Sequence, residues 1–127
     1  MNADKAELNR LSNLIIGCAL AVATTLGPGF VEKVYENALA HELRKVGISV
    51  AQQRGVVVRY DGAVVGEYAV DLLIEDSVVV ELKAVIALNN IHRAQCLNYL
   101  KATGLHMCLL LNFGSPRLEI KRLVRDL

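Results

Sequence analysis

Residues 70–83 read VDLLIEDSVVVELK, and this stretch decides the fold. Two runs rich in β-branched and other apolar residues, Val70 to Ile74 and Val78 to Leu82, flank the polar segment Glu75-Asp76-Ser77. Such runs on either side of a short polar turn are typical of a β-hairpin. If the turn pivots on Asp76, Ile74 lies opposite Val78 and Leu72 lies opposite Val80. This register also makes Asp71 and Glu81 direct neighbours across the two strands.

The pair Asp71 and Glu81 is the strongest candidate for a functional site. Opposed residues in a hairpin have Cβ atoms about 5 Å apart, and like charges at that spacing are destabilising unless something neutralises them. Side chains alternate between the faces of a strand, so Lys83 should share the face of Glu81. Leu73 and Val79 lie on that face too, which indicates partial cover over the charged groups.

Two adjacent carboxylates suit Mg²⁺ or Mn²⁺, which bind hard oxygen ligands and keep several waters. Such an ion would activate water and offset charge on a phosphodiester, and Lys83 would orient or deprotonate the water or donate to the phosphate. The alternative is that Asp71, Glu81 and Lys83 form a solvated cluster of ion pairs on an exposed strand face.

The rest of the chain predicts helices around this sheet. Apolar residues at three- and four-residue steps predict a helix from Ala6 to Thr25, which Gly27-Pro28-Gly29 ends. Gly66 is expected at a bulge or bend. The further expected elements are a helix over Phe30–Val46, a hairpin of Val56–Tyr60 and Ala63–Val65 around Asp61-Gly62, a helix from Asn89 or Asn90 to Thr103, and strands over Met107–Leu111 and Arg117–Val124. This order predicts an α/β fold with a mixed sheet and helices packed on it.

Length and composition predict a single domain over residues 1–127. The chain is 54% hydrophobic, and its 14 Lys and Arg nearly balance its 13 Asp and Glu, so a phosphate-binding surface would need local clustering. Cys18, Cys96 and Cys108 lack metal-site spacing and are expected to be free thiols in the cytoplasm. The apolar run from Leu14 to Ala23 resembles part of a signal peptide, but its charge-balanced flank and short length favour a core helix, with no membrane span.

Other polar residues are weaker candidates. Gln95, on the third expected helix, would orient water or contact phosphate near a metal site, or would be an ordinary surface residue. His92 is more often structural or solvated than a ligand. The basic residues Arg117, Lys121, Arg122 and Arg125 would follow a phosphate backbone or simply be a solvated edge strand.

The sequence resembles the GxxExxY family, which belongs to the PD-(D/E)XK nuclease-like superfamily. The likeness covers about residues 11–124 and rests on a combination of short motifs. They are Leu26-Gly27-Pro28-Gly29 with Phe30-Val31-Glu32-Lys33-Val34-Tyr35, Gly66-Glu67-Tyr68, Asp71-Leu72-Leu73, Glu81-Leu82-Lys83-Ala84, Ala94-Gln95, Asn98 to Gly104, Asn112-Phe113-Gly114 and Lys121-Arg122. The resemblance implies a restriction-endonuclease-like core, with a mixed central β-sheet flanked by helices.

The resemblance also assigns roles to individual positions. It implies that Glu32 is an early helical acid and metal ligand, that Asp71 and Glu81 are metal ligands, that Lys83 is the catalytic lysine, and that Gln95 is the polar residue of the following helix. Family members commonly carry Glu and His ahead of the Leu-Gly-Pro-Gly turn, where this chain has Ala21 and Ala23.

Three kinds of function follow from these patterns. The leading hypothesis is a metal-dependent nuclease that hydrolyses DNA or RNA with Mg²⁺ or Mn²⁺. The second is a non-catalytic nucleic-acid-binding or protein-interaction module that keeps the fold, which Ala21 and Ala23 favour. The third is a structural subunit that pairs through the first helix or an edge strand. A homodimer is compatible with each of them.

Overall fold

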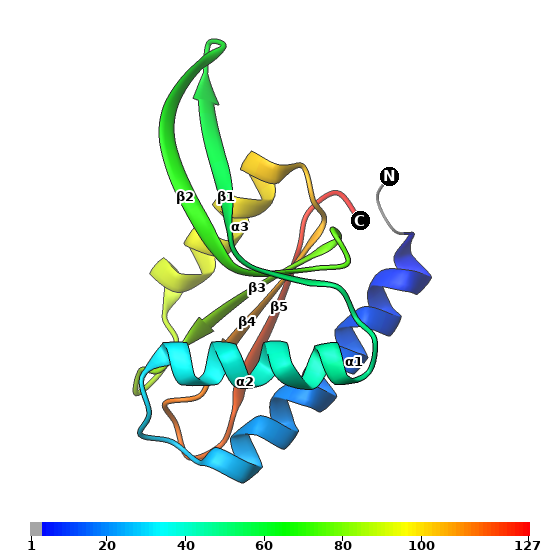
Figure 1. The fold of residues 1–127 in the computed structure, drawn as a ribbon. Coiled ribbons are helices and arrows are strands. Elements are labelled where there is room, and N and C mark those ends of the chain that lie inside the picture. The colour runs from blue at the N-terminus through cyan, green and yellow to red at the C-terminus, as the bar shows by residue number, and fades with distance from the viewer. Residues whose placement is uncertain (1–3) are drawn as a thin grey trace.

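The computed structural model describes residues 4–127, and Figure 1 shows how they fold into one sheet with three helices. The elements in chain order are α1 (Lys5–Leu26), α2 (Glu32–Lys45), β1 (Val50–Tyr60), β2 (Ala63–Ile74), β3 (Val78–Lys83), α3 (Asn90–Thr103), β4 (Met107–Asn112) and β5 (Glu119–Val124).

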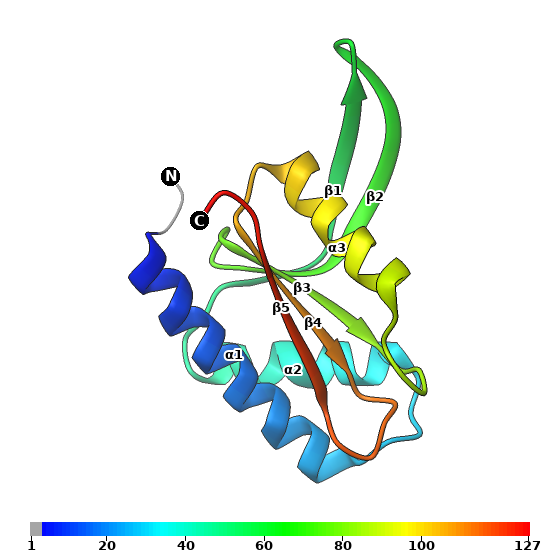
Figure 2. The same ribbon diagram turned by 180° about the vertical axis from the view of Figure 1, so that it is seen from behind.

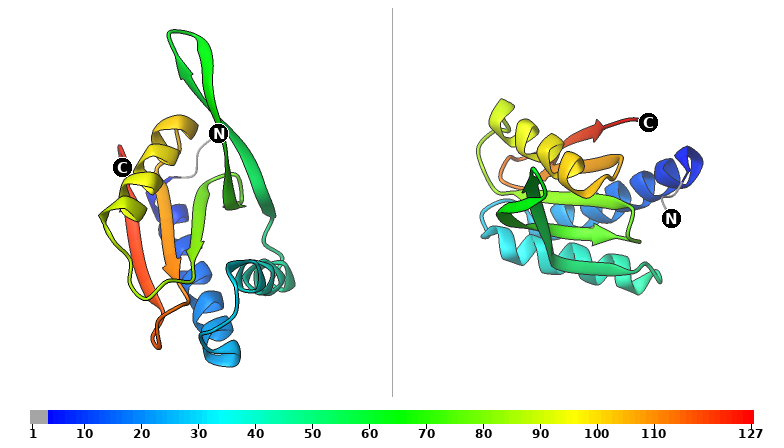
Figure 3. Two further views of the ribbon diagram at one scale, coloured as in Figure 1. Left: turned by 90° about the vertical axis from the view of Figure 1, so that its left-hand side faces the viewer. Right: turned by 90° about the horizontal axis from the view of Figure 1, so that it is seen from above.

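The sheet has the strand order β1-β2-β3-β4-β5, in which β3 and β4 are parallel and the other neighbours are antiparallel. One hydrophobic cluster joins α1 and α2 to one face of the sheet, and a second cluster joins α3 to the other face. Figures 2 and 3 show the resulting three layers. The predicted α/β fold with a mixed central sheet and flanking helices is confirmed.

Helix α1 is a core helix, as its periodicity predicts. It begins at the N-cap Asp4, whose side chain accepts a hydrogen bond from the Glu7 amide. By length and composition alone it could cross a membrane. In this structure, however, one stripe of the helix is buried against the sheet and α2. The stripe consists of Leu8, Leu11, Ile15, Ala19 and Val22.

The strands differ from prediction because the two expected hairpins share a strand. β2 runs without a break from Ala63 to Ile74, so β1, β2 and β3 form one antiparallel meander. The register shifts between Val58 and Arg59, opposite Gly66 and Val64, which confirms the predicted irregularity at Gly66. The outer parts of β1 and β2 extend away from the body of the molecule (Figure 1). We call residues 55–69 the arm.

Tyr35 explains why α2 begins at Glu32 rather than at Phe30. The buried Tyr35 hydroxyl donates to the Gly27 carbonyl at 2.5 Å and accepts from the Phe30 N–H at 3.1 Å. The ring also stacks on Phe113, with ring centroids 4.7 Å apart. Tyr35 thus holds the Gly-Pro-Gly turn in place as a loop, and the helix begins only after it.

Candidate active site

Asp71 lies where the sheet is interrupted on both sides of β2. Between β2 and β3, the ladder of paired residues runs from Ile74–Val78 to Leu72–Val80 and ends there, one residue before Asp71. Toward β1, the ladder skips the position of Asp71 between its pairs Gln52–Leu72 and Arg54–Val70. The unpaired β1 residue is Gln53, whose φ of 53° lies in the left-handed region. A left-handed conformation is strained for a residue other than glycine, and such strain clusters at functional sites.

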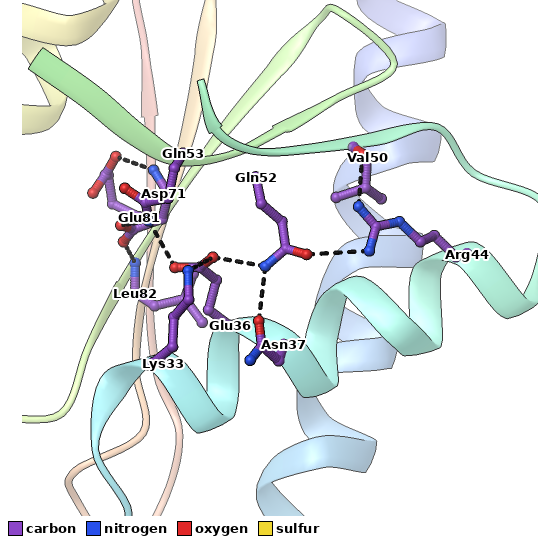
Figure 4. A network of polar contacts seen from close by, with 10 residues as sticks. All are labelled: Lys33, Glu36, Asn37, Arg44, Val50, Gln52, Gln53, Asp71, Glu81 and Leu82. Atoms are coloured by element: carbon purple, nitrogen blue, oxygen red, sulfur yellow. Dashed lines mark hydrogen bonds and ion pairs between the residues drawn. The ribbon is translucent and has the colours of Figure 1, made fainter. Parts of the chain in front are cut away.

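The side chains of Asp71 and Glu81 take over the hydrogen bonds that the backbone gives up. The Asp71 N–H donates to Glu81 Oε1 at 3.1 Å, and the Leu82 N–H donates to Asp71 Oδ2 at 2.8 Å. The predicted register of the hairpin is therefore confirmed, and the two acids face each other across the opening between β2 and β3. Figure 4 shows both carboxyl groups at this point.

Burial of the Glu81 carboxyl is the main electrostatic feature of the site. Glu81 is only 4% exposed. Burial, followed by the negative charge of Asp71, raises the pKa of Glu81 to about 9. In the absence of a cation, Glu81 is therefore protonated at neutral pH. A cation placed between the two carboxyl groups would stabilise the charged form of Glu81 and so oppose both effects.

Helix α2 contributes Glu36 to the network around this pair. Gln53 Nε2 donates to Glu36 Oε1 at 2.8 Å and to Asp71 Oδ1 at 3.2 Å, so one amide group bridges the two acids. Lys33 Nζ lies 2.8 Å from Glu36 Oε2. Gln52 also donates to Glu36, and it is held in turn by Arg44 (Figure 4). Burial alone would raise the pKa of Glu36, but hydrogen bonds from Lys33, Gln52 and Gln53 hold it below its usual value.

Glu32, the acid expected from α2, does not join this network. It is the first residue of the helix and is exposed, and no hydrogen bond or ion pair among residues 4–127 involves it. Nor do three acidic, His or Cys side chains gather anywhere in residues 4–127 as a metal-binding group. Glu36, one turn further along α2, is instead buried and bridged to Asp71. The role of Glu32 as a metal ligand stays a prediction.

A hydrogen bond between Lys83 and Gln95 forms a second polar contact of the site. Lys83 is half-buried, and its Nζ donates to Gln95 Oε1 at 3.4 Å, so β3 and α3 each supply one polar group. The first turn of α3 is fixed by Asn89, which accepts from the amides of Ile91 and His92. His92 Nδ1 accepts from the Asn89 N–H in return, at 3.2 Å. His92 is therefore a capping residue in this structure.

Tyr99 is a site residue that the sequence did not single out. It is largely buried on α3, one turn after Gln95. Burial and the nearby charges of Glu81 and Asp71 raise the pKa of Tyr99 to about 12. Its phenol is thus a neutral hydroxyl close to the acid pair. The sequence signals were its place four residues after Gln95, on the same face of a helix, and its position in the Asn98 to Gly104 motif of the resemblance.

Asn112 fixes the chain just after Lys83. This fully buried residue pairs with Lys83 across the β3–β4 ladder. Its side chain accepts from the Val85 N–H at 3.0 Å and donates to the Val85 carbonyl at 2.9 Å. A Cβ on Gly114 would lie 2.4 Å from the Val85 amide nitrogen and carbonyl oxygen. The Asn112-Phe113-Gly114 motif therefore holds the end of β3, and with it Lys83, by close backbone contact.

The residues at this site fit a divalent cation. Asp71 and Glu81 offer hard carboxylate oxygens on adjacent strands, and Glu81 is a buried acid whose carboxyl group lacks a cation as partner among residues 4–127. Mg²⁺ commonly binds to one or two protein carboxylates, with waters and substrate phosphate completing its shell. A set of two acids is therefore sufficient on chemical grounds.

The family comparison agrees with this arrangement. The model of the PD-(D/E)XK nuclease superfamily matches residues 9–123, and the chain belongs to that superfamily. Nucleases of this superfamily generally use divalent metals.

Two solved structures are similar to this chain. The structure described as SSO0001 has a TM-score of 0.52 at 15% identity, over 75% of this chain and 50% of that one. An alkaline exonuclease from Laribacter hongkongensis has a TM-score of 0.45 at 14% identity, over 74% of this chain and 56% of that one. The chain thus spans about half the length of these proteins. No curated protein matches it.

Proposed function

We propose that this protein is a divalent-metal-dependent nuclease that hydrolyses phosphodiester bonds in DNA or RNA. The observation that carries the proposal is the facing pair Asp71 and Glu81 at the break between β2 and β3, with Lys83 two residues further along β3. A structural ion pair would not need two acids facing each other, one of them buried. Superfamily membership supports the same conclusion.

Asp71 and Glu81 would hold Mg²⁺ or Mn²⁺. When bound, such an ion lowers the pKa of a coordinated water and offsets negative charge on the phosphate. Lys83 and Gln95 then act on the substrate side: the lysine donates to the phosphate or orients the attacking water, and Gln95 holds the lysine in position. The water oxygen would attack phosphorus and release one proton to solvent, and the bond to the leaving oxygen would break as that oxygen takes up a proton from solvent.

Gln53 and Glu36 would act through Asp71 as positioning residues. The Gln53 amide orients one Asp71 oxygen, while the Leu82 N–H holds the other. This leaves few orientations open to the Asp71 carboxylate, which is the preorganisation that a metal ligand requires.

A cleavage assay tests the proposal. Labelled single-stranded and duplex DNA and RNA are incubated with Mg²⁺, Mn²⁺ or EDTA, and with the variants Glu81→Gln and Lys83→Met. Metal-dependent cleavage by the wild type, lowered at least about 100-fold in both variants, is expected. Glu75→Gln, an exposed acid in the adjacent turn, is the matched control and should cleave like the wild type.

A non-catalytic binding module is the second candidate, because Ala21 and Ala23 replace polar residues common in the family. Ala21 is exposed on α1 and Ala23 is half-buried. Binding of nucleic acid without cleavage in every metal would favour this candidate. Cleavage that survives both Glu81→Gln and Lys83→Met would rule out the proposed site.

A further inference from the structure

A groove with a volume of about 760 Å³ lies between the arm and α3. Figures 1 and 3 show the arm rising beside this helix. Gln95 lines the groove and also accepts the hydrogen bond from Lys83, so one residue connects the groove to the lysine two positions after Glu81. Apart from Gln95 and Tyr99, the residues that line the groove have no role in the active site described above.

The charge of the groove is more positive than that of the chain as a whole. Arg59 and Lys101 line it, and no acidic residue does, although the whole chain has a net charge of only +1. Neither cation takes part in any hydrogen bond or ion pair among residues 4–127. The acids of the arm, Asp61 and Glu67, are not part of the lining. Two unpaired cations in an otherwise uncharged groove are complementary to phosphates.

The groove also offers an aromatic surface. The Tyr68 side chain is 54% exposed, and its ring meets that of Tyr99 edge to face, with centroids 6.1 Å apart and planes at 64°. Tyr99 is 7% exposed and is anchored on α3, so it fixes the position of Tyr68. An exposed tyrosine held by a buried one is a rigid platform on which a base can stack. Asn98, next to Tyr99, adds amide hydrogen-bonding groups.

We propose that this groove binds a single strand of nucleic acid and leads it to the Asp71–Glu81 pair, with Arg59 and Lys101 contacting phosphates and Tyr68 stacking on a base. This proposal rests on the proposed nuclease function and names the form of its substrate. Cations that follow the backbone and aromatic rings that stack on bases are the usual features of single-strand binding.

An unpaired strand fits better than a duplex for two reasons. Stacking on Tyr68 requires a base whose face is free, and the bases of a duplex are stacked on one another. A β-ribbon can enter a major groove, but the arm carries Asp61 and Glu67 against Arg59 alone, so it lacks the positive charge for that mode.

Fluorescence anisotropy tests the proposal in the Glu81→Gln background with EDTA present, so that no cleavage occurs. The probes are labelled oligothymidylate and oligouridylate of about 12 nucleotides and a blunt DNA duplex of the same length. Tyr68→Ala should weaken single-strand binding by about 5- to 100-fold, and Tyr68→Phe should restore it. The double variant Arg59→Ala/Lys101→Ala should also lower the slope of log K against log salt by about 1.4.

Matched controls come from the same chain. Tyr60, 75% exposed near the tip of the arm and outside the groove, controls for Tyr68. Lys5, exposed on α1, which packs on the opposite face of the sheet from α3, controls for the cations. Tyr60→Ala and Lys5→Ala should bind like the parent, and thermal melting should confirm that all variants fold.

The outcomes separate this proposal from the proposed function. If the wild type cleaves with metal while the groove variants bind like their controls, the groove proposal is wrong and the nuclease stands. If single strands bind through Tyr68 but no metal supports cleavage by the wild type, the groove stands and the nuclease is wrong. Duplex binding as tight as single-strand binding would also overturn the groove proposal.

Discussion

The two edges of β3 behave differently, and the difference places the site. Toward β4, every residue from Val78 to Lys83 is paired in one parallel ladder, and the paired residues are buried except for Lys83 at its end. Toward β2, pairing ends at Val80, and the side chains of Asp71 and Glu81 replace backbone partners. The fully paired β3–β4 side therefore fixes the strand, whereas the β2–β3 side opens at the point where the side chains of Asp71 and Glu81 face each other.

The side of β3 that is paired with β4 can be disrupted at Gly114, which packs against the residues that follow β3. Gly114→Ala would place a Cβ 2.4 Å from backbone atoms of Val85, which cannot move without disturbing the Asn112 hydrogen bonds. We expect the free energy of unfolding to fall by about 3 kcal/mol or more, measured by urea denaturation. Gly17→Ala in α1, where nothing lies within 4 Å, is the control and should stabilise by about 0.5–1 kcal/mol. Equal stability of the two variants would contradict the close contact.

The side of β3 that faces β2 can be tested through the pH dependence of the free energy of unfolding. The folded-state pKa of Glu81 is raised from 4.5 to about 9, so its contribution to stability is fully present below pH 4.5 and is lost as pH rises toward 9. With EDTA present, Glu81→Gln should unfold like the wild type at low pH. At pH 7, about 2.5 units above the ordinary pKa of 4.5, it should be more stable than the wild type by about 3 kcal/mol, since each pKa unit corresponds to about 1.4 kcal/mol.

Glu36→Gln is the matched control for this prediction. The pKa of Glu36 is lowered, so Glu36 stabilises the fold above its unfolded pKa and loses that effect as pH falls. The Gln variant should therefore be less stable than the wild type at pH 7. If Glu81→Gln were instead destabilising at pH 7, the acid pair would not carry the repulsion described here.

A smaller effect on stability is expected at Tyr35, which connects α2 to Phe113, the residue that follows β4. Tyr35→Phe removes the hydroxyl that bonds Gly27 and Phe30 but keeps the stacking on Phe113. The free energy of unfolding should fall by about 1–2 kcal/mol, because the Phe30 N–H and the Gly27 carbonyl lose a partner. Tyr60→Phe, on an exposed ring, should change stability by less than about 0.5 kcal/mol.

Much of the fold was predictable because the relevant signals are local. Periodicity located the first two helices, and capping residues located the third, from Asn89 or Asn90 to Thr103 before Gly104. The Glu75-Asp76-Ser77 turn fixed the register that brings Asp71 opposite Glu81. The arm was not predictable, since nothing local shows that the two hairpins share one continuous strand. Strict alternation along β2 would place Val70 on the same face as Leu72. Val70 instead packs with Leu73 on the side of α3, because the sheet is irregular at Asp71.

The site was predictable where it depends on one hairpin and less so where it depends on packing. Asp71, Glu81 and Lys83 follow from strand alternation alone. The choice between Glu32 and Glu36 depends on which turn of α2 lies under β1, and their spacing of one helical turn gives both a similar pattern in sequence. The bridge through Gln53 arises from a left-handed residue that no sequence signal marks.

The central claim is that Asp71 and Glu81 together hold a divalent cation, and calorimetric titration with Mn²⁺ tests it most directly. The wild type should bind about one Mn²⁺ ion per chain, more tightly at pH 8.5 than at pH 6.5 because binding displaces the Glu81 proton. Glu81→Gln and Asp71→Asn should abolish this binding, and Glu75→Gln should leave it unchanged. Binding of Mn²⁺ by Glu81→Gln with wild-type affinity would contradict the account.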